Sequence, residues 1–246
     1  MDELAPLARI RVVLCEPSHP GNIGAAARAM KTMGLVRLEL VQPRMYPHPD
    51  ADARASGALD VLRAARCHDS LDEALAGASL ICGLSARRRD LTPEVADART
   101  AAREIAAHGC DGEAAIVFGT ERVGLSIDAL SRCHRLVRIP ADPAYPSLNL
   151  AASVQVMAYE LRCACMEAGA MTPPQGSAVS PASHVEVERL VEHLERTMRA
   201  TGFLHSDRPG RLVQRMRRLL ARARPESEEV AILRGFLRSV SERDPR

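Results

Sequence analysis

IPADPAYPSLNLAASVQVMAY, residues 139–159, joins two structural patterns in one stretch. Its first half follows an apolar run and contains three prolines. Each proline fixes φ and lacks a backbone N–H, so neither a helix nor a central strand can continue through this half. From Ser147 the residues form a nearly uncharged helical pattern, and we expect a helix that begins at Ser147 and is capped by it. The proline-restrained loop thus brings Ser147, Asn149 and free helix N–H groups together.

The composition indicates a globular protein of the cytoplasm. The chain has 246 residues, enough for one substantial domain and a smaller one, with 46% hydrophobic and 26% charged residues. It shows no apolar run long enough to span a membrane, no signal peptide and no lipidation motif, so we expect a cytoplasmic protein. The 7 cysteines are scattered without a CxxC pair, which favours small buried side chains over a disulfide framework or a zinc site.

Short apolar runs alternate with helical patterns over the larger, N-terminal part of the chain. Buried strands are expected at residues 10–14, 35–41, 79–84, 114–118 and 136–139. Helices are expected at residues 22–33 with Asn22 as the cap, and at 58–65, 70–76, 93–108, 126–132 and 147–167, with a loop at 43–57. This alternation predicts an α/β fold, with a mainly parallel sheet and helices on both of its faces.

The loops rich in polar and small residues all follow predicted strands. They are residues 15–22, 83–87, 119–125 and 140–149. Parallel strands end at one edge of their sheet, and ligands of α/β folds bind at that edge. We therefore expect these four loops to form one site.

The C-terminal part has a different pattern. Prolines, Gly and Ser without an apolar period indicate a linker, and three amphipathic helical patterns follow it at residues 184–200, 209–223 and 225–240. The predicted units are residues 1–168, a linker at 169–183 and a helical tail domain at 184–246. The net charge is only +2, yet one segment of the tail carries seven arginines and no acid: Arg208, Arg211, Arg215, Arg217, Arg218, Arg222 and Arg224.

No single residue in these loops identifies a chemistry. Arg28 is compatible with a surface charge on a helix, and Glu121 lies between glycines that allow a tight turn. Ser147 and Asn149 are both good helix caps. The chain lacks the G-x-G-x-x-G, P-loop and G-x-S-x-G motifs and any paired-ligand spacing of histidines. These absences disfavour dinucleotide binding, serine hydrolysis and metal catalysis.

Three segments taken together resemble a known family. They are Asn22-x-Gly-x-x-x-Arg28, Phe118-Gly-x-Glu-x-x-Gly-Leu125 and Ile139-Pro-x-x-Pro-x-x-x-Ser-Leu-Asn-Leu-Ala-x-x-x-Gln-Val. In order and separation they are similar to the three motifs of the SPOUT superfamily of RNA 2′-O-ribose methyltransferases, most of all to its TrmJ-type tRNA branch. The resemblance covers roughly residues 8–167, and the linker and the arginine-rich tail match in arrangement.

The resemblance implies a fold detail and a cofactor. The family has a deep trefoil knot in the C-terminal segment of its sheet domain, and this knot cradles S-adenosyl-L-methionine. The positions that match the cofactor site are Leu84, Ser85, Ala86, Gly119, Ile139, Pro146, Ser147 and Leu148. Leu84 and Pro146 stand where the family often has Thr and Ser, so the contacts implied at these two positions are those of the backbone.

The resemblance also assigns catalytic roles. Arg28 matches the family's essential arginine, which engages the target phosphate. Because arginine stays protonated, we expect it to orient the substrate and stabilise charge rather than to abstract a proton. Glu121, Ser147 and Asn149 match the polar residues that support this step.

Two partners are implied in the same way, tRNA and a second copy of the chain. Phosphate contacts supply affinity that does not depend on sequence, so the tail would be an RNA-binding arm. The RNA-binding residues expected are Arg28, Arg211, Arg215 and Arg218. The family forms homodimers through the knot helices, with the active site drawing on both subunits. Small residues would suit that helix packing, namely Ala151, Ala152, Ala158 and Ala164. No metal and no membrane partner is expected.

The predicted function is S-adenosyl-L-methionine-dependent 2′-O-methylation of a ribose in tRNA, at the cytidine or uridine of position 32 in the anticodon loop. The alternatives are methylation of another RNA such as ribosomal RNA, a knotted RNA-binding module without catalysis, and an enzyme that acts on a small nucleotide. The presence of Arg28, Glu121, Ser147 and Asn149 argues against the second alternative, and the arginine-rich tail argues against the third.

Overall fold

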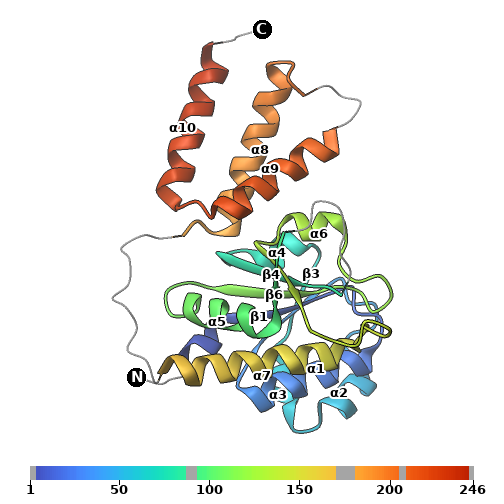
Figure 1. Ribbon diagram of the computed structural model, residues 1–246. Coiled ribbons are helices and arrows are strands. Elements are labelled where there is room, and N and C mark those ends of the chain that lie inside the picture. Colours follow the sequence, from blue (N-terminus) through green and yellow to red (C-terminus); the bar gives the residue numbers. More distant parts are fainter. Residues whose placement is uncertain (1–3, 87–92, 170–180, 205–208, 244–246) are drawn as a thin grey trace.

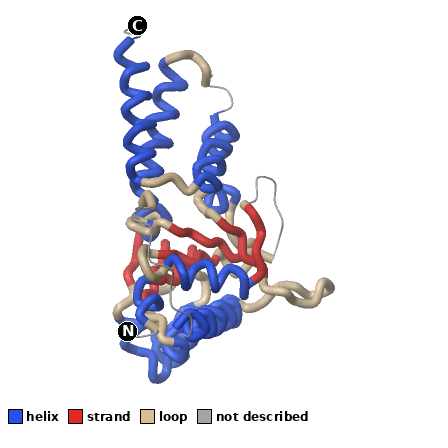
Figure 2. The backbone as a smooth tube through the Cα atoms, turned by 60° about the vertical axis from the view of Figure 1, so that its left-hand side comes forward, coloured by secondary structure: helices blue, strands red, loops and turns tan. Residues whose placement is uncertain are grey.

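A parallel sheet forms the centre of the molecule (Figures 1 and 2). The computed structural model describes residues 4–86, 93–169, 181–204 and 209–243, and in these residues the sheet has seven strands. They are β1 (Ile10–Cys15), β2 (Arg37–Val41), β3 (Arg66–His68), β4 (Leu80–Leu84), β5 (Glu94–Asp97), β6 (Ala114–Phe118) and β7 (Arg135–Arg138). The spatial order is β3-β2-β1-β6-β4-β7-β5, and every neighbouring pair is parallel. The predicted α/β fold with a mainly parallel sheet is confirmed.

Helices cover both faces of the sheet, as predicted. The helical elements of this domain are η1 (Ala5–Arg9), α1 (Pro20–Met33), α2 (Pro49–Ala55), η2 (Ser56–Ala58), α3 (Leu59–Arg63), α4 (Leu71–Leu75), α5 (Ala98–His108), α6 (Ile127–Ser131) and α7 (Leu150–Gly169). Successive side chains of β1 point to opposite faces of the sheet. Val12 and Leu14 pack in the core under α1, α5 and α7, whereas Val13 packs in the core under α4 and α6.

Two short edge strands and one short helix were not predicted. Residues 93–108 were expected to form a single helix, but residues 94–97 are β5, and α5 begins only at Ala98. The side chain of Asp97 accepts a hydrogen bond from the backbone N–H of Thr100 at 3.0 Å, which caps α5 at that point. β3 has three residues and pairs only with β2, and α2 lies within the loop expected at residues 43–57.

The start of α1 also differs from the prediction, and this difference matters for the site. Asn22 was expected to cap the helix, but α1 begins at Pro20, whose fixed φ suits the first turn. At Gly24 the helix crosses α2 so closely that a Cβ atom would lie 2.0 Å from the backbone oxygen of Ala51. The motif glycine therefore sets the packing of α1 on α2.

The tail domain consists of three helices around a small core of its own. They are α8 (His184–Ala200), α9 (Pro209–Ala223) and α10 (Ser227–Arg243), close to the three predicted ranges. Leu190, Val213, Leu220 and Val230 are among its buried residues. Most of the predicted linker, residues 170–180, lies outside the described residues, so the domain boundaries stay a prediction.

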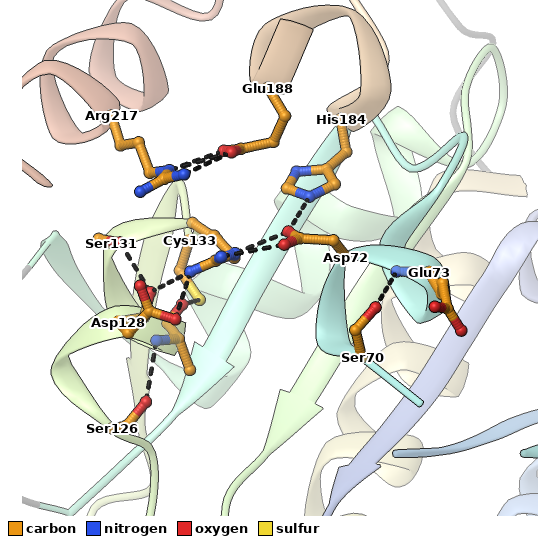
Figure 3. A network of polar contacts seen from close by, with 12 residues as sticks. Ser70, Asp72, Glu73, Ser126, Asp128, Ser131, Cys133, His184, Glu188 and Arg217 are labelled. Carbon is orange, nitrogen blue, oxygen red and sulfur yellow. Dashed lines mark hydrogen bonds and ion pairs between the residues drawn. The ribbon is translucent and has the colours of Figure 1, made fainter. Parts of the chain in front are cut away.

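A polar network joins the tail to the sheet domain on the side of α4 and α6 (Figure 3). The ring Nε2 of His184 donates to Asp72 at 2.8 Å, and Arg132 donates to the same carboxylate at 2.7 and 3.0 Å. The backbone N–H of His184 also donates to the oxygen of Ala78 at 2.8 Å. Burial acts to raise the pKa of Asp72, but the hydrogen bonds from His184 and Arg132 outweigh it and hold this pKa well below its usual value. An ion pair between Arg224 and Glu104 is a second link.

Replacing Asp72 by alanine tests this junction. The side chains of Arg132 and His184 are 10% and 4% exposed, so Asp72→Ala leaves two shielded donors without their shared acceptor. We expect the free energy of opening at the His184 amide, measured by hydrogen exchange, to fall by roughly 1–3 kcal/mol. Asp60→Ala is the control, because its exposed pair with Lys31 should leave that exchange unchanged.

The junction should also depend on pH in one direction. Because the pKa of Asp72 is lowered in the folded chain, its contribution is complete above the ordinary aspartate pKa and is lost as the pH falls below it. Protection of the His184 amide should therefore weaken on acidification in the wild type and stay flat in Asp72→Ala. A wild-type amide that kept its full protection in acid would contradict this account.

Candidate active site

A cleft of about 420 Å³ opens at the carboxyl edge of β4, β6 and β7. Its walls come from residues 84–86, 118–124, 139 and 145–150, and His19, Asn22 and Ser153 complete it. The volume lies within the range of roughly 300–1,000 Å³ that is typical of small-molecule sites. The four strand-end loops that were expected to form one site all contribute to this cleft.

Three side chains from separate motifs form a continuous hydrogen-bond relay at one end of the cleft. Asn149 donates through Nδ2 to Oδ1 of Asn22 at 3.0 Å. Asn22 in turn donates through its own Nδ2 to Oε1 of Glu121 at 3.1 Å. These residues come from the end of the proline loop, the first turn of α1 and the loop after β6, so the relay fixes the three segments relative to one another.

Glu121 is the most heavily hydrogen-bonded member of the relay. Besides Asn22, its carboxylate accepts from the backbone N–H and the hydroxyl of Ser18, at 3.1 and 2.9 Å, and from the N–H of His19 at 3.3 Å. Burial acts to raise the pKa of Glu121, but the donors, with Asn22 as the strongest, lower it below its usual value. Glu121 is therefore held as an anion and is a weak proton acceptor at neutral pH.

The turn that carries Glu121 depends on its first glycine. The N–H of Gly124 donates to the oxygen of Thr120 at 2.9 Å, so the chain folds back directly after β6. A Cβ atom on Gly119 would lie 2.1 Å from the backbone carbon of Gly124. Only glycine allows this approach of two backbone segments, which places Glu121 opposite Ser18.

The cap of α7 is Asn149 rather than Ser147. The helix was expected to begin at Ser147, but it begins at Leu150, and Oδ1 of Asn149 accepts from the N–H groups of Ala151 at 2.9 Å and Ala152 at 3.4 Å. Asn149 immediately precedes the first helical residue, where its side chain reaches these groups. Ser147 stays in the loop, and its hydroxyl makes no hydrogen bond with the residues that the structure describes.

The structure brings together most of the predicted site residues. The eight residues expected to bind the cofactor all line the cleft: Leu84, Ser85, Ala86, Gly119, Ile139, Pro146, Ser147 and Leu148. Three of the four predicted catalytic residues, Glu121, Ser147 and Asn149, line it too. Arg28 does not. It lies exposed on α1, outside the cleft lining, without a hydrogen bond or ion pair to any described residue.

The predicted RNA-binding arginines of the tail lie on α9, and those whose side chains the structure describes do not line the cleft. Arg215 is exposed and Arg218 is partly buried, with its Nε shielded from solvent and unpaired within the described residues. The side chain of Arg211 lies outside the described part.

Asn22 and Ser18 are site residues that the sequence interpretation missed. Asn22 opened the first motif but was taken only as a helix cap. Because α1 begins two residues earlier, its side chain is not used by the helix and can reach Glu121. The signal in the sequence was the position of Pro20, a good first helical residue. Ser18 carried no comparable signal.

Among the described residues, none of the helices combines the length and the hydrophobicity that a membrane span requires. Nor do these residues hold a group of three or more His, Cys, Asp or Glu side chains arranged to bind a metal ion.

Comparison with known proteins identifies the family. The SpoU rRNA Methylase family model matches residues 9–159, which include the whole cleft. A model of the TrmJ tRNA methyltransferase C-terminal domain matches residues 185–246, the three-helix tail. The chain belongs to the SpoU methylase family and, within it, to the TrmJ group.

Relatives of the full length support this assignment. The tRNA (cytidine/uridine-2′-O-)-methyltransferase TrmJ of Klebsiella pneumoniae is 48% identical, over 97% of this chain and 98% of its own. The crystal structure of TrmJ from Z. mobilis ZM4 matches with a TM-score of 0.84 at 33% identity, covering 95% of this chain and 100% of that one. A structure described as giving insights into the 2-OH methylation of C/U34 on tRNA matches with a TM-score of 0.53 at 28% identity, covering 65% and 99%.

Replacing Asn22 by alanine should raise the pKa of Glu121. In Asn22→Ala the carboxylate loses its strongest side-chain donor, so we expect its pKa to rise towards the ordinary glutamate value. An NMR titration of the side-chain carboxyl carbons measures this change. The internal control is Glu113 at the opposite edge of the sheet, whose pKa is lowered by Arg37 and Arg11 and should not move.

Asn22→Ala should also change how the stability of the protein depends on pH. A lowered pKa in the folded state means that the stability gained from Glu121 is present above its unfolded pKa and is lost as the pH falls through the folded one. The acid-side loss of stability should therefore be smaller in Asn22→Ala than in the wild type. An unchanged Glu121 titration in the variant would show that Asn22 does not hold the anion.

Proposed function

We propose that the protein transfers a methyl group from S-adenosyl-L-methionine to the 2′-hydroxyl of a ribose in tRNA. The observation that carries this proposal is the relay of Asn149, Asn22 and Glu121, which joins three motifs of the family at one end of a cleft of cofactor size. Relatives named TrmJ over their full length support tRNA as the substrate. A tRNA substrate would place the enzyme in the cytoplasm.

The nucleotide that we propose is the cytidine or uridine at position 32 of the anticodon loop. This position comes from the resemblance to the TrmJ branch. A second candidate is position 34, because one of the similar structures concerns the methylation of C/U34 on tRNA. Ribosomal RNA is a third, because the matching family model is named for rRNA methylases.

The residues of the cleft fit the proposed cofactor. The walls are built from strand ends and a proline loop, with small or apolar side chains at Leu84, Ala86 and Ile139. Such walls leave room for a nucleoside and offer backbone groups for hydrogen bonds. S-adenosyl-L-methionine would supply an electrophilic methyl group on its sulfonium. The trefoil knot that the resemblance implies around this site remains part of the proposal.

The polar residues of the cleft would act by orientation. Glu121 is an anion already engaged by Ser18, His19 and Asn22, so we assign it the task of holding the relay rather than of taking a proton. Asn149 is held at both ends, by the helix N-terminus and by Asn22. A fixed relay of this kind can hold a ribose hydroxyl in line with the methyl group.

Arg28 would complete the site of a second subunit in a homodimer. It lies outside the cleft of its own chain, although the resemblance makes it the central catalytic residue. The outer side of α7 supports this arrangement, because Tyr159 and Met166 there are 53% and 52% exposed. Of the alanines expected at the dimer seam, Ala158 and Ala164 are buried in the core of their own chain, which leaves Ala151 and Ala152 for a partner.

Methyl transfer to purified tRNA and ribosomal RNA tests the function. With tritiated S-adenosyl-L-methionine we expect label in tRNA, and mapping of the modified nucleotide separates position 32 from position 34. Arg28→Ala should lower turnover by roughly 100-fold or more and leave the cofactor affinity from calorimetry nearly unchanged, because the cleft lining is intact. Arg63→Ala is the matched control, an exposed arginine on α3. Weaker cofactor binding with normal turnover in Arg28→Ala would contradict the assigned role.

Mixed dimers test the shared site. Arg28→Ala and Asn149→Ala should each be inactive alone. In a dimer with one copy of each, one site combines the intact Asn149 of one chain with the intact Arg28 of the other. An equal mixture that exchanges subunits freely should regain roughly a quarter of the wild-type activity. If the mixture stays inactive although mixed dimers form, Arg28 does not act across the subunits.

A further inference from the structure

A group of basic side chains lies between α8 and α10 of the tail domain. His193 and Arg196 are one turn apart on α8, and Arg234 and Arg238 are one turn apart on α10. The two helices pack against each other and both point away from the sheet domain (Figure 1). Burial, and then the charges of the three arginines, lower the pKa of His193. All three guanidinium groups therefore act on the same imidazole ring.

This α8–α10 cluster has hydrogen-bond donors without acceptors. Nδ1 of His193 and Nε of Arg234 are shielded from solvent and have no partner within the described residues. Arg196 and Arg238 make no ion pair with those residues either. Glu195 is close in sequence, but Arg199 engages it at 2.6 Å. Shielded polar groups are rarely left unpaired in native proteins, so a bound anion would account for this arrangement.

The arginine-rich segment at residues 208–224 differs from the cluster because part of its charge is paired inside the protein. Arg217 makes a two-pronged ion pair with Glu188 on α8, with a shortest distance of 2.7 Å, and Arg224 pairs with Glu104 of the sheet domain. Two of its arginines are thus neutralised inside the protein. The number of arginines in this segment therefore overstates its unpaired charge, although Nε of Arg218 is also shielded and unpaired within the described residues. In the α8–α10 cluster, none of the three arginines makes an ion pair with the described residues.

We propose that the α8–α10 cluster is a phosphate-binding site for the backbone of the tRNA substrate. The proposal rests on the proposed function, which it deepens by locating a contact of the RNA-binding arm. The planar guanidinium groups of Arg196, Arg234 and Arg238 suit the oxygens of a phosphodiester, and His193 adds a further ring nitrogen donor. The phosphate would neutralise charges that the chain leaves unpaired.

Salt-dependent tRNA binding by the full-length protein is the first test. The double variant Arg196→Ala with Arg238→Ala removes two exposed side chains, so the fold is not at risk. We expect the slope of log affinity against log salt concentration to fall by roughly two, with turnover at saturating tRNA unchanged. The control, Arg63→Ala with Arg66→Ala, removes two exposed charges from the sheet domain and should keep the slope. An unchanged slope in the first variant, or an equal fall in the control, would overturn the proposal.

Inorganic phosphate supplies a second test that does not depend on catalysis. Phosphate should raise the pKa of His193 in the wild-type protein, followed by NMR of the ring, because an anion offsets the neighbouring arginines. The rise should vanish in the double variant. If the wild-type protein passes both tests but does not methylate tRNA, the proposed function is wrong and the phosphate-binding site still stands. Phosphate binding without any effect of the double variant on tRNA affinity would show a site for free anions only and overturn the proposal.

Discussion

The carboxylate of Glu121 is the point on which the geometry of the cleft depends. Burial favours its neutral form, and the donors from Ser18, His19 and Asn22 favour the anion and prevail. Those donors belong to the loop after β1 and the first turn of α1, so hydrogen bonds to this one carboxylate connect residues 18–22 to the loop after β6. Asn149 connects α7 to the same group through Asn22, and it also caps the N-terminus of α7. The cleft can therefore stay open between these loops.

The packing of the backbone brings these segments close enough for the hydrogen bonds to form. β1, β6 and β4 are adjacent and buried, so their carboxyl ends deliver three loops to the same edge of the sheet. Two glycines then allow approaches that no side chain would permit: Gly24 sets α1 against α2, and Gly119 folds the Glu121 turn back on itself. The motif glycines thus help to position the polar residues of the site.

The sequence predicted the elements that are buried on both sides and missed those at the edges. β1, β4 and β6 are continuous apolar runs, whereas β3 and β5 each have one neighbour and a partly exposed pattern that does not differ from a loop or a helix turn. In the site, Glu121 and Asn149 could be predicted from the motifs. Asn22 could not, because its role depends on where α1 begins, and Arg28 lies outside the cleft of its own chain.

In the tail, the number of arginines alone does not show how much positive charge is free to bind a ligand, because some arginines form ion pairs within the protein. Its seven arginines between residues 208 and 224 were taken as one basic segment, yet Arg217 and Arg224 serve as internal anchors. Together with the pair of His184 and Asp72, the Arg224 contact attaches the tail to the sheet domain at two separate points. Two anchors restrict rotation where one would allow it. The two contacts therefore limit the orientations that the tail can take relative to the cleft, and a tRNA bound to the tail as proposed would be limited in the same way.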